Sequence, residues 1–271
     1  MARRRWILHG NGDLLGDKVV LSGIIRALRA AEAGEIIGVE GNEFLSMKAF
    51  LEPPDRIVHW RDLNRGAFLP AQHDLVIAPQ DRNSIPPPAP EIPGVVTCSL
   101  WRMAHESIQA GFAPALSTPW AAEALPGPVV IHHRNLPRNR SRNTDYMDVA
   151  ELSLGLARHG LRVLVLGDQD PGLAHELAGQ HAVCLAGRMS PESFLQVLAT
   201  AQIFIGGDSG PRHTACAFGR PIICLGQARG RHGPFPLYPG QVWVPGRVSD
   251  ALRLALDLCY LAPRKHQRMA I

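Results

Sequence analysis

The chain has 271 residues, which is enough for one large domain or two small domains that each bury a core. Hydrophobic residues make up 46% and charged residues 19% of the chain, a composition that is typical of a globular protein and excludes a disordered one. The net charge of +4 fits an anionic ligand or work at a membrane surface, but it does not require nucleic acid. Apolar runs are too short for a membrane span or a signal-peptide core, so we expect a cytoplasmic protein.

The chain contains five cysteines, an odd number, and no two of them have the CxxC spacing of metal ligands. We expect them to be reduced core residues, because free cysteine packs as a small apolar side chain. They are Cys98, Cys184, Cys216, Cys224 and Cys259. The sequence therefore predicts neither a disulfide framework nor a metal site.

In the first half, short apolar runs alternate with segments of helical periodicity. Strands are predicted at residues 6–9, 36–39, 56–59, 74–78 and 95–99, and helices at 18–31, 42–50 and 101–111. Strands that alternate with helices predict a parallel sheet.

A stretch with four prolines and little periodicity, residues 113–128, is the best linker candidate. A second alternation follows it. Strands are predicted at 129–132, 161–166, 182–185, 203–205, 221–225 and 242–244, and helices at 145–159, 171–179, 190–200, 211–218 and 249–261. We therefore expect an α/β protein with two similar halves, residues 1–120 and 121–271.

The most informative segment for function is residues 203–225. A strand enters the turn at residues 206–210, and a helix follows with Pro211 at its first position and Asp208 or Ser209 as its cap. Backbone N–H groups at the positive end of a helix are a site where phosphate binds. Gly210 and His213 lie in or near this turn, and for His213 a ligand role is favoured over that of a buried helix residue.

Ligands of open parallel sheets bind at the carboxyl ends of the strands. In the first half, Asp13 and Asp17 lie in the loop after the first strand. Either carboxylate can act as a general base or cap the following helix. The glycines of this loop give the spacing GxGxxxG, which is not the dinucleotide fingerprint.

In the second half, the strand at 129–132 leads into an arginine-rich loop. Its arginines are Arg134, Arg138, Arg140 and Arg142. Arginine clamps phosphate oxygens, although a solvated basic loop is the alternative. One of the two histidines at the strand end, His132 and His133, can contact a ligand. The alternative is a buried histidine whose ring nitrogens are hydrogen-bonded within the protein.

The next polar loop follows the strand at 161–166 and contains Asp168, Gln169 and Asp170. A carboxylate at this place can accept the two hydroxyl groups of a ribose. The alternative is that these residues cap the helix that begins at Pro171.

Residues 208–217 read DSGPRHTACA, and Arg220-Pro221 and a strand up to Gly226 follow. This block resembles the D-[ST]-G-x-x-H-x-A-A signature of glycosyltransferase family 9, the lipopolysaccharide heptosyltransferases and their relatives. Residues 186–207 are similar to the strand–helix–strand that precedes this signature. Gly12-Asp13-Leu14-Leu15 resembles the family's G-D-[VIL]-[LI] loop.

The resemblance implies the GT-B fold, in which two Rossmann-like domains face each other across a cleft. It implies that the N-terminal domain, which is short for this family, binds the acceptor and that the C-terminal domain binds a nucleotide-sugar donor. The sugar would move with inversion, with Asp13 as the base for the acceptor hydroxyl. The departing nucleoside diphosphate would be stabilised by the Ser209-Gly210 amides, the helix N-terminus and an arginine of the 134–142 loop.

This scheme requires no metal ion or other cofactor and no nucleic acid. The donor would be linked to ADP or GDP, heptose is a candidate sugar, and the acceptor would be a glycan, a lipid-linked glycan or a small molecule. A peripheral contact with the inner face of the membrane is left open.

Two features separate this chain from the family pattern. The family's lysine after the first strand of the C-terminal domain is absent, and arginines stand in its loop. The sequence His132-His133-Arg134 is also similar to the H-x-R loop of GDP-fucose-dependent fucosyltransferases, which share GT-B geometry. A nucleotide-sugar hydrolase or epimerase on this scaffold, and a non-catalytic nucleotide-binding protein, are the remaining alternatives.

Overall fold

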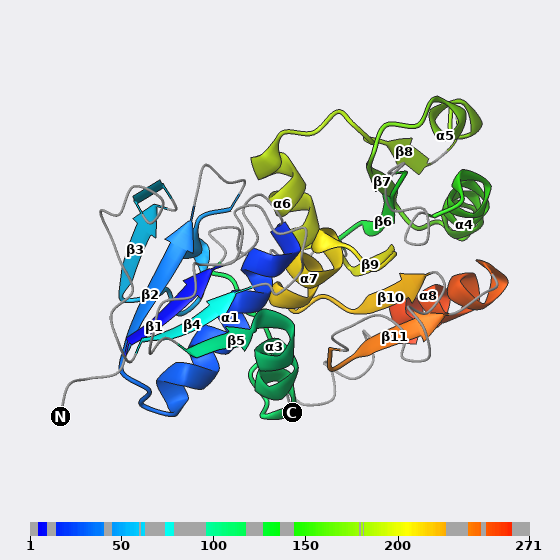
Figure 1. Cartoon of the computed structure of the whole chain (residues 1–271). Helices are drawn as coiled ribbons and strands as arrows, with labels where there is room; N and C mark the ends of the chain where they lie inside the picture. Colours follow the sequence, from blue (N-terminus) through cyan, green and yellow to red (C-terminus); the bar gives the residue numbers. More distant parts are fainter. Residues whose placement is uncertain are drawn as a thin grey trace. The chain divides into compact units, whose positions relative to one another are not determined.

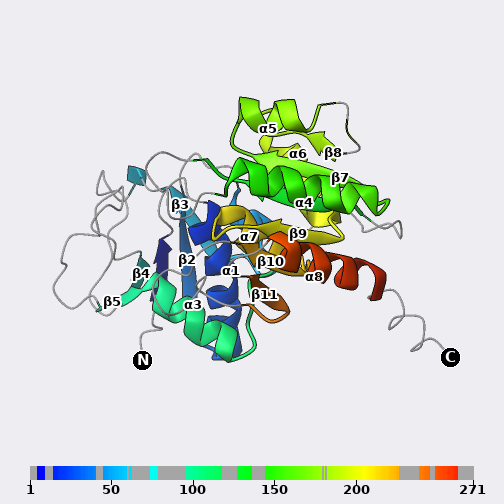
Figure 2. The ribbon, with the colours of Figure 1, turned by 90° about the vertical axis from the view of Figure 1, so that its right-hand side faces the viewer.

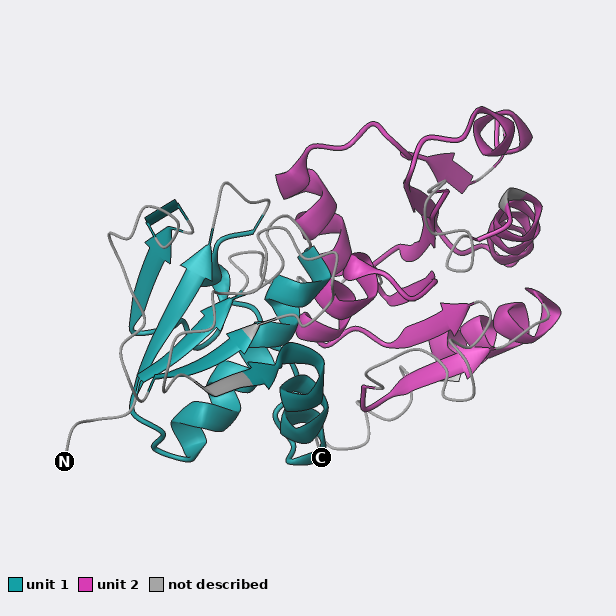
Figure 3. Ribbon diagram, viewed as in Figure 1, with its two compact units in different colours: residues 1–118 teal, residues 119–271 magenta. Residues whose placement is uncertain are grey.

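The computed structural model describes residues 5–9, 15–40, 45–59, 61–62, 74–78, 96–117, 127–135, 144–178, 180, 182–225, 238–244 and 248–261. The chain divides into two compact units, Met1–Thr118 and Pro119–Ile271 (Figure 3). The division falls inside the proline-containing stretch that was the linker candidate. Each unit is an α/β structure built on a parallel sheet.

The first unit contains a five-stranded parallel sheet in the order β3-β2-β1-β4-β5 (Figure 1). Its strands are β1 Arg5–His9, β2 Glu35–Glu40, β3 Arg56–His59, β4 Leu75–Ala78 and β5 Val96–Ser99. Its helices are α1 Leu15–Ala30, the 3-10 helix η1 Met47–Ala49, and α3 Leu100–Gln109. Helices α1 and α3 pack against each other, and one face of the sheet buries Ile7, Ile37, Val39, Val58 and Val76 together.

The helix predicted at 42–50 is wrong in its described part, where only the single turn of η1 forms. The amide of Met47 donates to the Glu40 carboxylate at 2.9 Å, and the amide of Lys48 donates to the Ser46 hydroxyl at 3.2 Å. Because these side chains take up the amides locally, they compete with a continuing helix.

The second unit contains a six-stranded parallel sheet in the order β11-β10-β9-β6-β7-β8. Its strands are β6 Val129–His133, β7 Val163–Gly167, β8 Ala182–Cys184, β9 Ile203–Gly206, β10 Ile222–Leu225 and β11 Gln241–Val244. Its helices are α4 Tyr146–Arg158, α5 Pro171–Glu176, α6 Pro191–Thr200, α7 Gly210–Ala217 and α8 Val248–Leu261. The predicted elements of this half are therefore confirmed, with shifts of a few residues at their ends.

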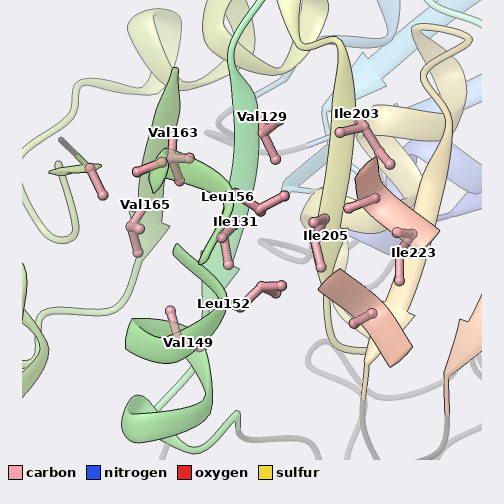
Figure 4. Packing of buried hydrophobic residues seen from close by; sticks show 14 of the residues in the cluster. Val129, Ile131, Val149, Leu152, Leu156, Val163, Val165, Ile203, Ile205 and Ile223 are labelled. Carbon is pink, nitrogen blue, oxygen red and sulfur yellow. The ribbon is translucent and has the colours of Figure 1, made fainter. Parts of the chain in front are cut away.

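The main core of the second unit lies between one face of this sheet and helices α4 and α8. Strand residues such as Val129, Ile131 and Ile205 contribute to it, and Leu152 and Leu156 of α4 pack onto them (Figure 4). Figure 2 shows α4 and α8 side by side, and the two helices contact each other. Each fully buried aliphatic side chain stabilises such a core by roughly 1.5–3 kcal/mol.

Both sheets have the same connectivity. Numbered from its own first strand, each sheet follows the order 3-2-1-4-5, and the second sheet adds a sixth strand. This is the Rossmann order, in which ligands bind at the carboxyl ends of the strands beside the point where the order reverses. That switch point lies between β1 and β4 in the first unit and between β6 and β9 in the second.

All five cysteines lie in described parts of the chain and carry free thiols. Only Cys224 and Cys259 are fully buried, and the other three are half-buried. None of the helices in the described ranges has the length and apolar character needed to cross a membrane.

Candidate functional site

The start of α7 lies at the carboxyl end of β9, beside the switch point of the second sheet. Ser209 is the N-cap residue, but within the described residues its side chain makes no capping hydrogen bond, and the hydroxyl donates to the Gly207 carbonyl at 3.3 Å. The predicted cap by Ser209 is therefore wrong. Side chains do cap three neighbouring helices, and these residues are Asp145, Asp170 and Ser190. Pro211 has no N–H and the Arg212 amide donates to the Ser209 carbonyl at 3.1 Å, so the Gly210 amide is the first-turn N–H that could bind an anion.

Asp208 is held by a buried arginine one turn later. The side chain of Arg212 is fully buried, and its Nη2 lies 2.8 Å from Asp208 Oδ1. Its Nη1 donates to Gln241 Oε1 at 2.7 Å, and its guanidinium carbon lies 5.2 Å from the centre of the Tyr238 ring. Because a buried charge needs partners, these contacts fix both Arg212 and the turn that begins at Asp208.

His213 is 4% exposed and lies against Tyr238. Its Nδ1 is hydrogen-bonded to the Tyr238 hydroxyl, and the two rings meet edge to face with centroids 5.6 Å apart. Burial raises the pKa of Tyr238 well above 10, so the phenol stays protonated. Its other ring nitrogen, Nε2, lies 3.5 Å from Arg212 Nη2, so both nitrogens of His213 lie against protein groups, and its contact with a ligand stays a prediction.

Arg134 reaches across the switch point from the end of β6. Its Nη1 donates to the backbone carbonyl of Asp208 at 3.3 Å, and its own amide donates to Thr144 Oγ1 at 3.0 Å. The structure therefore brings Arg134 to the turn that precedes α7. Arg138 and Arg140, the other predicted phosphate ligands, lie outside the described residues.

The loop after β7 holds the three residues predicted to bind ribose or base. Asp168 Oδ2 accepts the amide of Asn135 at 2.8 Å. Asp170 Oδ1 caps α5 by accepting the amides of Gly172 and Leu173 at 3.0 and 3.1 Å, so the capping alternative is found for this residue. The hydrogen bond between Asn135 and Asp168 therefore connects the loop after β7 to the residues that follow β6.

The remaining oxygen of Asp170, Oδ2, lies 3.2 Å from His133 Nε2 and from Asn135 Nδ2. Burial alone would raise the pKa of Asp170, but hydrogen bonds from the Leu173 amide, His133 and the Gly172 amide hold it below its ordinary value of 3.8. Asp170 is therefore an ionised carboxylate at neutral pH.

Gln169 and Asp170 also line a pocket of about 390 Å³ at the carboxyl ends of β7 and β8. Its other polar side chains include His175 and Arg188. Two of the three residues predicted to bind ribose or base therefore border this pocket at the carboxyl ends of the strands.

In the first unit, the predicted base Asp13 lies outside the described residues. Asp17 lies inside the first turn of α1, which begins at Leu15, so it does not occupy the cap position, and it is buried. Lys18 beside it is buried as well, and the pKa of His9 at the end of β1 falls to about 4 through burial and the charge of Lys18. An acidic side chain in the first turn, such as Asp17, stabilises the helix by interacting with the positive end of the helix dipole.

Residues 144–234 match the family model described as glycosyltransferase family 9 (heptosyltransferase). The resemblance to this family is confirmed. The matched range contains α4 to α7 and the turn at residues 206–210, so the family 9 segment includes the candidate anion site. The chain is a glycosyltransferase, related over this segment to the heptosyltransferases.

Three solved structures extend the likeness beyond the matched segment. A family 9 glycosyl transferase from Veillonella parvula is 14% identical with a TM-score of 0.67, covering 96% of this chain and 98% of its own. The E. coli ADP-heptose lps heptosyltransferase II is 14% identical with a TM-score of 0.70, covering 96% and 99%. The E. coli heptosyltransferase WaaC with ADP is 14% identical with a TM-score of 0.57, covering 94% and 99%.

At this identity the three structures show the fold, and the predicted GT-B fold of two parallel-sheet domains is confirmed. None of the curated protein sequences matches the chain significantly. Within the described residues, no three His, Cys, Asp or Glu side chains gather as metal ligands would.

Sequence reasoning missed several residues that shape the candidate site. Arg212 stands at a variable position of the D-[ST]-G-x-x-H motif, and its spacing of four from Asp208 was a usable signal for a helical ion pair. The contacts that Gln241, Tyr238 and Asn135 make had no comparable local signal.

Proposed function

We propose that this glycosyltransferase moves a sugar from a nucleoside-diphosphate sugar to an acceptor hydroxyl, with inversion at the anomeric carbon and without a metal ion. The observation that carries the proposal is the start of α7, a helix N-terminus without a side-chain cap from Ser209, at the switch point of a Rossmann sheet and inside the family 9 segment. Both features favour a diphosphate at this place.

The donor proposed first is ADP-heptose. Among the similar structures, WaaC is described with ADP and with ADP-2-deoxy-2-fluoro heptose. In this chain the Asp168 carboxylate would accept ribose hydroxyls, and Gln169 would border the base at the pocket of about 390 Å³, which Asp170 also lines. Asp168 has one oxygen besides the Oδ2 that accepts the Asn135 amide, and that oxygen is available to a hydroxyl.

The proposed chemistry is a direct displacement. Asp13 takes the proton of the acceptor hydroxyl, the acceptor oxygen bonds to the anomeric carbon, and the bond from that carbon to the phosphate oxygen breaks. The negative charge that develops on the diphosphate is stabilised by the Ser209-Gly210 amides and Arg134, with Arg138 and Arg140 as further arginines of the same loop. Asp208 and His213 complete the proposed donor site, and their contacts with Arg212 and Tyr238 hold the turn in place.

The acceptor is proposed to bind to the first unit, as a glycan, a lipid-linked glycan or a small molecule. A lipid-linked acceptor would bring the enzyme to a membrane surface. The net charge of +4 supports this contact, because anionic lipids attract basic proteins.

A thermal-shift comparison of ADP, GDP, UDP and dTDP tests the donor site. A ligand that binds only the native state stabilises it by about 2.7 kcal/mol at a concentration of 100 times its dissociation constant. We expect ADP to raise the melting temperature most. If all four nucleotides leave it unchanged, the proposed donor site is wrong.

Transfer assays with ADP-heptose test the reaction itself. We expect a product with the anomeric configuration opposite to that of the donor, and a rate that EDTA does not change. A rate that EDTA abolishes and added magnesium restores would exclude the metal-independent scheme. Hydrolysis of the donor at full rate without any acceptor would favour a hydrolase instead.

A further inference from the structure

Two neighbouring histidines, His132 and His133, end strand β6 and point to opposite faces of the second sheet, because side chains alternate along a strand. His133 is 1% exposed. Its Nδ1 lies 3.1 Å from Thr144 Oγ1, and its Nε2 lies 3.2 Å from Asp170 Oδ2. Both of its ring nitrogens are therefore engaged by the protein, and it is a satisfied core histidine.

His132 lies on the other face, in an aromatic setting. Its ring stacks near Phe204 of β9 at a centroid distance of 6.4 Å and meets Phe194 of α6 edge-on at the same distance. Its partner across the ladder is Gly206, the last residue of β9. A Cβ at Gly206 would lie only 3.1 Å from the Cβ of His132, so the glycine leaves room for the imidazole beside the turn that leads into α7.

One ring nitrogen of His132, Nδ1, is shut off from solvent and has no hydrogen-bond partner in the described part of the chain, and the residue as a whole is 7% exposed. A buried N–H without an acceptor is rarer in proteins than a buried acceptor without a donor, so the proton belongs on Nε2. Burial lowers the pKa of His132 to about 4, so the ring is neutral at pH 7.

We propose that His132, and not His133, is the histidine that binds the donor, with its Nε2–H donating a hydrogen bond to a diphosphate oxygen of the nucleotide sugar. This inference rests on the proposed function, because it places that ligand at the switch point between β6 and β9. His132 pairs with Gly206 there, and the backbone of β9 continues directly into residues 207–210. A neutral N–H that meets an anionic oxygen forms a stronger bond than a neutral pair does.

The test compares two amide variants of His132 with a matched variant of its neighbour. In His132→Gln the side-chain amide reaches about as far as Nε2, whereas in His132→Asn it stops near the position of Nδ1. The probe is whichever of ADP, GDP, UDP and dTDP raises the melting temperature of the wild-type protein, and its dissociation constant is measured by calorimetry. We expect His132→Asn to weaken binding about tenfold and His132→Gln to stay within about threefold of wild type.

His132→Phe keeps an aromatic ring against Phe194 and Phe204 but has no N–H, and it is expected to lose affinity as His132→Asn does. The control His133→Gln breaks contacts to Thr144 and Asp170, so it should lower the melting temperature while the folded protein still binds the nucleotide within about threefold of wild type. Wild-type affinity in both His132→Asn and His132→Phe, or a greater loss in His133→Gln, would overturn the assignment. Failure of the wild-type protein to bind any of the four nucleotides would instead remove the donor site as a whole.

Discussion

Arg212 and Asp208 form an ion pair of 2.8 Å across the first turn of α7, with the Arg212 side chain fully buried and the Asp208 side chain 16% exposed. Removing one member of a buried pair leaves the other charge without compensation, which typically costs 3–5 kcal/mol. Because Asp208 keeps some exposure, we expect Arg212→Met to lower the free energy of unfolding by about 3 kcal/mol, measured by urea denaturation.

A matched control for this ion pair lies on α8, where Arg253 and Asp250 approach to 3.8 Å with side chains 78% and 53% exposed. Arg253→Met is expected to leave the urea midpoint unchanged, because exposed pairs contribute little. Equal effects of the two substitutions would show that burial of Arg212 does not matter for stability.

Gly167 ends β7 with a φ of +117°, and a Cβ there would lie 1.8 Å from the carbonyl oxygen of His133. Gly160 also has a positive φ, +76°, but a Cβ there would meet nothing within 4 Å. We expect Gly160→Ala to cost about 1 kcal/mol from backbone strain alone. Gly167→Ala must also displace the end of β6, so it should cost more than about 4 kcal/mol. Thermal unfolding of the two variants measures the difference, and equal melting temperatures would refute the predicted clash.

The Asp170 carboxylate links folding to pH. Its pKa in the folded protein lies below its ordinary value of 3.8, so its contribution to stability is fully present above that value and is lost as the pH falls through the folded pKa. Asp170→Asn keeps an oxygen for the α5 cap but loses the charge. We expect the variant to be less stable than wild type at pH 7, by about 1 kcal/mol.

The stability difference between Asp170→Asn and wild type should shrink as the pH falls below 4, when the wild-type carboxylate takes up its proton. Urea denaturation at pH 7, 5 and 3 measures it. A difference that stays constant over these pH values would mean that the charge of Asp170 contributes nothing.

Asp13→Asn tests the proposed base. An amide cannot accept the acceptor's proton, so we expect kcat to fall by a factor of about 10² to 10⁴ while donor affinity stays near the wild-type value. Asp17→Asn is the matched variant, and we expect it to act on stability, since Asp17 is buried in the first turn of α1. Loss of turnover in a folded Asp17→Asn protein, with Asp13→Asn active, would assign the base to Asp17.

The elements of the fold could be predicted from local pattern, but their partners in the sheet could not. Parallel strands buried on both faces read as continuous apolar runs, and those at Val129–His133 and Ile203–Gly206 are clear in the sequence. Their pairing side by side joins residues far apart along the chain, and no local feature encodes it.

The same difference between local and long-range features holds for the residues of the candidate site. The helix predicted at 190–200 is found as α6, and Ser190, its neighbour in sequence, caps it. Ser209 stands in a similar position before α7 but turns its hydroxyl to Gly207. The burial of Arg212 depends on Tyr238 and Gln241, which reach it only through the tertiary structure.

The central strand pair of the second sheet also sets an order of events during synthesis. Strand β6 can pair with β7 once Gly167 has emerged from the ribosome, but its other neighbour, β9, ends only at Gly206. Until then, one edge of β6 offers unpaired backbone groups that other chains can bind. This edge of β6 therefore stays open while the residues between β7 and β9 are being made, and β9, the strand that leads into the α7 turn, closes it by pairing.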